Sequence, residues 1–269
     1  MAKIFPNNLY RLRQEGSLCK LFGIKLTPSA AVVQMAAAAG FDALFIDLEH
    51  SALSVNDASQ LCTIGLLAGT TPFVRVPYQC GDGLVQRVLD GGAMGVIFPH
   101  VSTRGEAESA VSISKYPPAG KRSSTGQLPQ FGYAAQPHSI MIPECNNVGS
   151  TVIVMIETQE ALQNLDAIAS VPGVDVLLVG SNDLTVELGI PAQFDSPVYK
   201  EAMEKVSQAC KKHGKIMGLG GVYDNPTIQG WAVHELGVGF ILGGQDSSFI
   251  AKGAKACVEA LVKVEGNQN

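Results

Sequence analysis

Charged and polar residues stand where apolar, strand-like runs of this chain end. Asp47, Glu49 and His50 follow the run 43–46, Arg75 lies within the run 72–76, Glu157 follows 152–156, and Asp183 follows 176–180. In a barrel of parallel strands the active site forms at the C-terminal strand ends, so these side chains would converge on one pocket. Acids, a base and a cation that share a pocket predict catalysis.

Glu157 and Asp183 follow consecutive strands and could share one divalent cation through carboxylate oxygens. The structural alternative is a helix cap, since both residues precede helical patterns and Asp is a favoured cap. A carboxylate that closes an apolar strand is expensive to bury without a partner. With no His ligand beside them in the sequence, Mg²⁺ or Mn²⁺ is favoured, while Co²⁺, Ni²⁺ and Zn²⁺ stay open because carboxylate sites are not metal-specific.

Arg75 and His50 are the cation and the base of this set. A permanent charge inside an apolar strand needs a partner, which is either a buried salt bridge or an anionic substrate or oxyanion. His50 lies three positions after Asp47, close enough for that carboxylate to orient the imidazole, and is the predicted general base. His100 also ends a strand and could reach the pocket.

Short apolar runs alternate with amphipathic segments along the chain. Strands are predicted over residues 19–26, 43–49, 72–76, 95–99, 151–157, 174–180, 215–220 and 239–243, with helical patterns between them, including 30–39, a helix capped by Ser54 or Asn56, 83–89 and 104–115. Strands that alternate with helices indicate a parallel sheet, and near-continuous apolar strands indicate burial on both faces. The prediction is an α/β fold with a single (β/α)8 TIM barrel domain over residues 1–269.

Two segments depart from this alternation. Residues 117–143 are rich in Pro, Gly, Ser and Gln and are predicted to form a long excursion above the strand 95–99, either a lid or subunit contact or a plain surface loop. Residues 247–265 predict a last helix with an apolar side that must pack. Its own barrel is the default partner, and a neighbouring subunit is the alternative.

Composition narrows the class of protein. The 269 residues are 46% hydrophobic and 16% charged, enough to bury a large core. The formal net charge of -5, without any Lys/Arg cluster, argues against nucleic acid or a membrane surface as a partner and favours a small molecule. Six cysteines without a C-x-x-C pair indicate reduced thiols, and the lack of a signal-like or membrane-spanning run predicts a cytoplasmic protein.

Five separated segments together resemble the HpcH/HpaI aldolase family. They are 41–50 (FDALFIDLEH), 74–76 (VRV), 116–122 (YPPAGKR), 156–161 (IETQEA) and 178–184 (LVGSNDL), and they occur in order over nearly the whole chain. The resemblance implies a metal-dependent aldolase that uses pyruvate on a (β/α)8 barrel. It also implies a homo-oligomer, a hexamer or trimer of dimers, whose last helix is exchanged between subunits.

The resemblance also implies roles for individual residues. Glu157 and Asp183 would hold the divalent metal, which chelates the carboxylate and ketone of a 2-oxo acid. Arg75 would hold the enolate oxygen, and His50, oriented by Asp47, would relay the proton through water.

Main-chain amides at the predicted helix start, around Ser181, Asn182 and Asp183, would bind the substrate carboxylate. Two positions depart from the family pattern. Many members have Gln where this chain has Met155, and a small residue where it has Asn182, so the acceptor molecule is left open.

The predicted reaction is cleavage or formation of a 4-hydroxy-2-oxo acid through a pyruvate enolate, with an aldehyde or another acceptor. The family also includes macrophomate synthase, so an oxaloacetate decarboxylase that uses the same enolate is the first alternative. Three further readings stay open. They are a Schiff-base aldolase that uses Lys25, a phosphate-binding barrel enzyme with Gly218, Gly220, Gly221, Gly243 and Gly244 at its last strand ends, and a non-catalytic binding protein, suggested by Met155.

Overall fold

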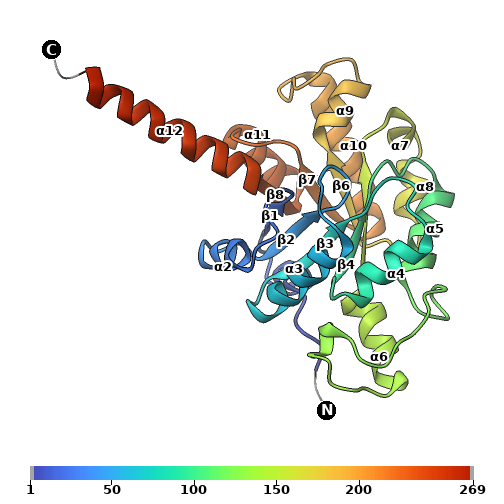
Figure 1. Cartoon of the computed structure of the whole chain (residues 1–269). Helices are drawn as coiled ribbons and strands as arrows, with labels where there is room; N and C mark the ends of the chain where they lie inside the picture. The colour runs from blue at the N-terminus through green and yellow to red at the C-terminus, as the bar shows by residue number, and fades with distance from the viewer. Residues whose placement is uncertain (1–2, 267–269) are drawn as a thin grey trace.

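Parallel strands close into one barrel in the computed structural model, which describes residues 3–266. The eight strands follow chain order around the barrel, and β8 pairs with β1 (Figure 1). They are β1 (Cys19–Ile24), β2 (Ala43–Asp47), β3 (Thr71–Arg75), β4 (Gly95–Phe98), β5 (Thr151–Ile156), β6 (Val176–Gly180), β7 (Ile216–Gly220) and β8 (Val238–Gln245). The predicted (β/α)8 barrel is confirmed, and most of the polar residues of interest lie just past the strand ends.

Helices cover the outside of the barrel. They are α2 (Ala30–Ala38), α3 (Val55–Leu67), α4 (Asp82–Asp90), α5 (Arg104–Ser114), α7 (Gln159–Gln163), α8 (Leu165–Ala169), α9 (Ser181–Glu187), α10 (Pro197–His213) and α11 (Pro226–Trp231), with a π-helical turn at Ala232–Leu236. Local sequence explains where they begin. Ser54 and Asp57 form a reciprocal capping box before α3, and Thr103 and Glu106 form another before α5, so backbone N–H groups that would lack a partner are satisfied.

The interior of the barrel is packed with side chains from alternate strands. Phe73 and Phe240 meet there edge to face, with ring centroids 5.7 Å apart. A short helix that the sequence pattern did not predict, α1 (Asn8–Gln14), closes the end opposite the polar strand ends. Its Leu9 and Leu12 join the interior cluster, and Asn8 Nδ2 donates to two main-chain carbonyl groups. Seven residues are too few for helical periodicity to stand out.

The excursion over residues 117–143 does not lie above the C-terminal end of β4, so its predicted position and the lid alternative are wrong, whereas a subunit contact or a plain surface loop stays open. It joins α5 to β5, and helix-to-strand connections of a parallel barrel lie at the N-terminal end of the strands. It contains a 3₁₀ turn at Pro129–Phe131 and α6 (His138–Glu144), followed by a π-helical turn at Cys145–Gly149. Gln130 Nε2 donates to the carbonyl oxygens of Leu89 and Ala93, which ties the excursion to the α4–β4 connection.

The last helix, α12 (Asp246–Gly266), projects away from the barrel (Figure 1). The default prediction that it packs on its own barrel is wrong beyond its first turn, because Asp246 is its one buried residue within the described part of the chain. Phe249 stacks on Phe22 of β1, with ring centroids 5.2 Å apart. The apolar side chains that follow stay exposed, among them Ile250, Val258, Leu261, Val262 and Val264. Large exposed apolar patches on proteins generally mark interaction surfaces.

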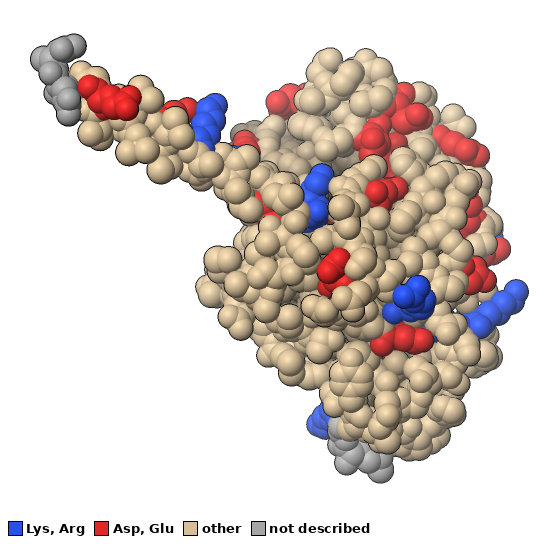
Figure 2. Space-filling model, in the orientation of Figure 1, with Lys and Arg blue, Asp and Glu red and all other residues tan. Residues whose placement is uncertain are grey.

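On the face drawn in Figure 2, Lys and Arg side chains stand singly, whereas Asp and Glu side chains gather around α7 and α9. The acidic balance of the sequence is therefore visible on this surface. None of the helices within residues 3–266 has the length and apolar character needed to span a bilayer.

Candidate active site

The C-terminal strand ends surround a cavity of about 260 Å³. Its lining includes Lys25, Phe45, His50, Arg75, Met155, Gly180, Ser181, Asn182, Asp183, Tyr223, Leu242 and Gln245. Residues from seven different βα units thus meet at one mouth, although they are far apart in the sequence. The volume suits a small metabolite rather than a large acceptor.

Arg75 is held rigidly at this mouth by two carboxylates. Its Nε donates to Asp47 Oδ1 at 3.0 Å and its Nη2 to Asp47 Oδ2 at 2.6 Å, while Nη1 lies 3.1 Å from Glu49 Oε2. The guanidinium carbon also lies 5.3 Å from the centroid of the Phe45 ring. Arg75 is 8% exposed and still lines the cavity. The sequence left two alternatives for Arg75, a buried salt bridge or a position that faces a substrate. Arg75 forms the salt bridge and faces the cavity as well.

Asp47 does not orient the His50 ring, so that prediction is wrong. Both Asp47 oxygens face the Arg75 fork, and Oδ1 also accepts from the main-chain N–H groups of Glu49 and His50. Strand register explains this choice, because Asp47 and Arg75 are paired residues of β2 and β3. Burial alone would raise the pKa of the Asp47 carboxyl, but the hydrogen bonds and charge of Arg75 outweigh it and bring this pKa below its ordinary value.

His50 lies at the rim of the cavity with its ring largely exposed. Its Nε2 is 3.7 Å from Glu49 Oε2, so Glu49 is the carboxylate beside this imidazole. Glu49 therefore stands between the cation and the base candidate. Glu49 was among the polar residues predicted at the strand ends, but no role was predicted for it.

Glu157 is buried with one oxygen satisfied and the other free. Oε1 accepts from the main-chain N–H of His100 at 2.7 Å and lies 3.2 Å from His100 Nδ1, whereas Oε2 is a buried atom without a partner among the described residues. Burial is the main cause that raises the pKa of Glu157 to about 7, with the charges of Asp183 and Glu49 adding to it against the lowering effect of His100. A cation would relieve this arrangement.

Gly180, at the end of β6, makes room for the free oxygen of Glu157. A Cβ atom at this position would lie 2.1 Å from Glu157 Oε2 and 3.0 Å from the Met155 methyl group. Glu157 Oε2 therefore lies against the wall of the cavity that Gly180 and Met155 line. A side chain larger than hydrogen at residue 180 would displace the carboxylate.

The cap readings of Glu157 and Asp183 do not hold. Thr158 caps α7, Gly180 precedes α9 without any side-chain cap, and Asp183 lies in the first turn of α9. The main-chain amides of this first turn have no acceptor within the helix, because the opening N–H groups of any helix lack one. The Ser181 hydroxyl is engaged with Tyr199 at 2.7 Å, which leaves its main chain for the cavity.

The donor set fits a hard divalent cation held by two carboxylates. A larger site made of protein ligands alone is absent, because residues 3–266 contain no cluster of three or more His, Cys, Asp or Glu side chains that could hold a metal. Mg²⁺ and similar ions are commonly bound through one or two carboxylates, with water and substrate completing the shell. The unpartnered Glu157 Oε2, with the charge of Asp183 acting on it, agrees with such a site.

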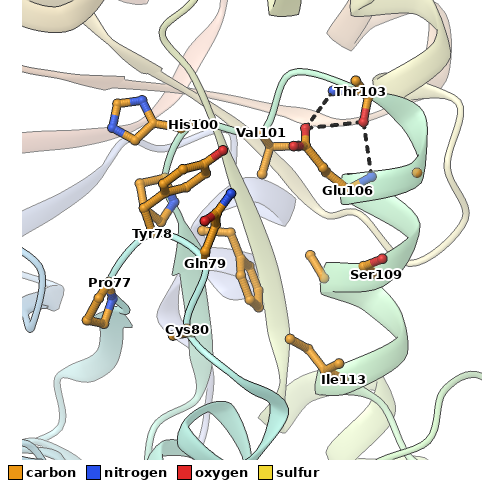
Figure 3. A pocket seen from close by; sticks show the side chains of 14 residues that line it. Pro77, Tyr78, Gln79, Cys80, His100, Val101, Thr103, Glu106, Ser109 and Ile113 are labelled. Atoms are coloured by element: carbon orange, nitrogen blue, oxygen red, sulfur yellow. Dashed lines mark hydrogen bonds between the residues drawn. The ribbon is translucent and has the colours of Figure 1, made fainter.

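His100 joins the site to a second cavity. This cavity has a volume of about 370 Å³ and lies between the β3–α4 loop and α5. Figure 3 shows the His100 and Tyr78 side chains together at its edge, and their ring centroids are 5.2 Å apart. His100 has a positive φ of 53°, which turns its N–H toward Glu157. The strand-end position of His100 was the signal in the sequence that pointed to this contact.

Comparisons with known proteins agree with this arrangement. The family model described as "HpcH/HpaI aldolase/citrate lyase" matches residues 26–242. The 4-hydroxy-4-methyl-2-oxoglutarate aldolase tasA of Hapsidospora irregularis is 52% identical over 97% of each chain. The 4-hydroxy-4-methyl-2-oxoglutarate aldolase cghB of Chaetomium globosum is 49% identical over 96% of each chain. The crystal structure of an HpcH/HpaI aldolase from Desulfitobacterium hafniense DCB-2 superposes with a TM-score of 0.88 at 28% identity, over 96% of this chain and 97% of that one.

Replacement of Asp47 by Asn should destabilise the fold in a pH-dependent way. Removing one partner of a buried ion pair typically costs about 3–5 kcal/mol. Because the folded pKa of Asp47 is depressed, its contribution is complete above the unfolded value of about 3.9 and is lost as the pH falls through the folded value. Denaturant unfolding from pH 7 to pH 3 should show the gap between wild type and variant closing below about pH 4.

Asp195→Asn is the matched control, since Asp195 is exposed. Its effect should stay within about 0.5 kcal/mol at every pH. A gap for Asp47→Asn that does not change with pH would contradict the ion-pair interpretation.

Proposed function

Because the chain belongs to the HpcH/HpaI aldolase/citrate lyase family and is a carbon–carbon lyase, we propose that it is a divalent-metal-dependent aldolase for 4-hydroxy-2-oxo acids. The observation that carries this proposal is that one barrel mouth holds two features: Glu157, whose buried Oε2 has no partner among the described residues, and a rigidly held Arg75. In this proposal residues 1–269 act as one barrel domain.

The substrate class follows from the relatives and from the cavity. Two relatives, 52% and 49% identical to this chain, are called 4-hydroxy-4-methyl-2-oxoglutarate aldolases. Cleavage of that compound between C3 and C4 would give two molecules of pyruvate, because the fragment that carries the hydroxyl group becomes a second 2-oxo acid. The acceptor in the reverse direction would then be a ketone rather than an aldehyde. A cavity of about 260 Å³ agrees with a substrate of this size.

Glu157 and Asp183 would hold the metal, with Mg²⁺ or Mn²⁺ as the first candidates. When bound there, the cation would supply Lewis-acid polarisation of the substrate ketone, an effect worth several kcal/mol. The first-turn amides of α9, at Ser181, Asn182 and Asp183, would bind the carboxylate of the 2-oxo acid, and their position in the cavity lining supports this role.

The remaining steps belong to side chains of this chain. His50, at the rim, would take the proton of the C4 hydroxyl group through water as the C3–C4 bond breaks, and the bonding electrons would pass to C3 and the C2 oxygen as an enolate. Arg75 would donate to that oxygen as its negative charge grows, already fixed by Asp47 and Glu49. Proton transfer to C3 then releases pyruvate.

The exposed apolar side of α12 supports assembly with further copies of the chain. We propose that α12 packs on a neighbouring subunit, as the family resemblance implies. The hexameric state and the cytoplasmic location stay predictions.

Glu157→Gln is expected to abolish turnover and the response to metal. The substitution keeps the volume but removes the anionic ligand, so pyruvate release should fall to background. Mn²⁺ should raise the melting temperature of the wild type, because a ligand that binds the folded state stabilises it, and should not raise that of the variant. Without metal, the variant should be at least as stable as the wild type, because an unpartnered buried carboxylate is costly.

Glu160→Gln, in the exposed part of α7, provides the matched control and should behave like the wild type. The metal assignment fails if Glu157→Gln retains near-normal turnover without a higher metal requirement.

His50→Ala should separate the base from the enolate-stabilising groups. Decarboxylation of oxaloacetate reaches the enolate by loss of CO2 and needs no base, whereas aldol cleavage must first deprotonate a hydroxyl group. We expect aldol cleavage to fall by about 10²–10⁴ while most of any oxaloacetate decarboxylation remains. Arg75→Ala should abolish both reactions. Steady-state assays with the two substrates measure the difference.

His138→Ala replaces an exposed histidine far from the mouth and serves as the control. Equal suppression of both reactions by His50→Ala, with metal still bound, would reassign His50 to substrate binding. A wild type that decarboxylates oxaloacetate but cleaves no 4-hydroxy-2-oxo acid would favour the decarboxylase alternative.

The assembly proposal predicts that Glu at both Val258 and Leu261 will lower the molar mass in solution. Both side chains are exposed on α12, and charges there would oppose burial against another copy. Light scattering after size exclusion should show an oligomer for the wild type and smaller species for the variant. Val198→Glu, at an exposed valine of α10, should leave the mass unchanged; a monomeric wild type would contradict the proposal.

A further inference from the structure

Lys25 brings a positive charge to the side of the cavity that faces the two acids. It follows β1, which lies diametrically across the closed barrel from β5, the strand that Glu157 follows. Lys25 and Asp183 both line the cavity. The mouth therefore has an acidic side at β5 and β6 and a basic side at β1.

Lys25 forms no salt bridge with any residue that the structure describes. Arg75, the other cation of the cavity lining, is paired with Asp47 and Glu49. Lys20, near the other end of β1, pairs with Asp42 at 3.3 Å. The ammonium group of Lys25 is thus available to an anion inside the cavity.

The main chain that carries Lys25 is anchored. Asp246, buried at the start of α12, accepts hydrogen bonds from the N–H groups of Lys25 at 3.1 Å, Leu26 at 3.0 Å and Thr27 at 2.8 Å. A loop tied at three successive amides holds the base of the Lys25 side chain in a defined place. Less conformational freedom is then lost when the ammonium group binds a ligand.

Gln245 supplies a neutral donor and acceptor beside Lys25. Its position in β8 is paired with Gly23 of β1, and a Cβ atom on Gly23 would lie 2.6 Å from Gln245 Cγ. The Gln245 side chain therefore lies over β1 at Gly23, which is two residues before Lys25 in the chain. Gln245 and Lys25 line the same cavity. Phe45, Met155 and Leu242 form an apolar floor that continues into the barrel interior.

We propose that Lys25, assisted by Gln245, binds the distal carboxylate of a dicarboxylic 4-hydroxy-2-oxo acid. This inference rests on the proposed aldolase function and names the feature that selects its substrate. The 2-oxo acid end lies at Glu157, Asp183 and the start of α9, and the carbon chain crosses the apolar floor. The second carboxylate ends at Lys25, so diacids are selected over monoacids of the same shape.

The test compares two substrates that differ in one group. 4-Hydroxy-4-methyl-2-oxoglutarate has a distal carboxylate, and 4-hydroxy-4-methyl-2-oxopentanoate has a methyl group in its place. Wild type should prefer the diacid, and Lys25→Met should lower the ratio of the two kcat/KM values by about 10- to 100-fold, as expected for loss of a charge-assisted hydrogen bond. Lys25→Arg should keep most of the preference. Lys20→Met, which removes the same charge at the other end of β1, should keep the wild-type ratio.

Binding of unreactive 2-oxo acids gives a readout that does not depend on turnover. In the presence of Mn²⁺, calorimetry should show 2-oxoglutarate binding more tightly than 2-oxopentanoate to the wild type, and Lys25→Met should remove the difference. Equal losses for diacid and monoacid would overturn the inference while leaving the aldolase proposal intact. Borohydride trapping of substrate on Lys25 would also overturn it, in favour of a Schiff base. A wild type that cleaves neither substrate refutes the aldolase proposal, and the binding comparison then decides on Lys25 alone.

Discussion

The guanidinium of Arg75 is a permanent charge in the mouth of an apolar barrel, and the site depends on how that charge is matched. Register makes Asp47 the residue opposite Arg75 on the neighbouring strand, so the two side chains meet as a fork against a carboxylate. Glu49, two residues further on the same chain, reaches the remaining nitrogen and extends toward His50. Arg75 is therefore a rigid donor near the expected enolate oxygen. Neither Arg75 nor Asp47 can move without leaving the other as a buried charge without its partner.

Glu157 presents the opposite situation, since one of its oxygens is buried with no partner in the described structure. Gly180 has no side chain to fill the space that this oxygen occupies, and the His100 amide fixes the other oxygen. Within the described residues, the barrel thus keeps a carboxyl oxygen without a partner on one side of its mouth and an ammonium group without a salt bridge, that of Lys25, on the other. A substrate with a metal-chelating end and a distal anion would match both sides at once.

Much of the fold could be read from the chain because strands buried on both faces leave continuous apolar runs, such as 176–179, that end abruptly in polar residues. The sequence also narrowed the cap of α3 to Ser54 or Asn56, and Ser54 is the cap in the structure. The partner of Asp47 could not be predicted from the sequence. Proximity along the chain favoured His50, whereas the register of β2 and β3 places Arg75 opposite Asp47. The location of residues 117–143 was missed for a related reason. A loop's composition does not say at which end of the barrel it lies, and only its place between α5 and β5 does.

The amino-acid sequence by itself determined the parallel barrel, its family and the residues that gather at its mouth, because hydrophobic periodicity and strand-end position are local properties of the chain. Tertiary structure decided which of those residues face one another. The Asp47–Arg75 pair, the position of Glu157 Oε2 beside Gly180, the place of Lys25 in the cavity and the outward course of α12 all depend on contacts between segments far apart in the chain. Such contacts follow from register and closure of the barrel, which no single stretch of sequence contains.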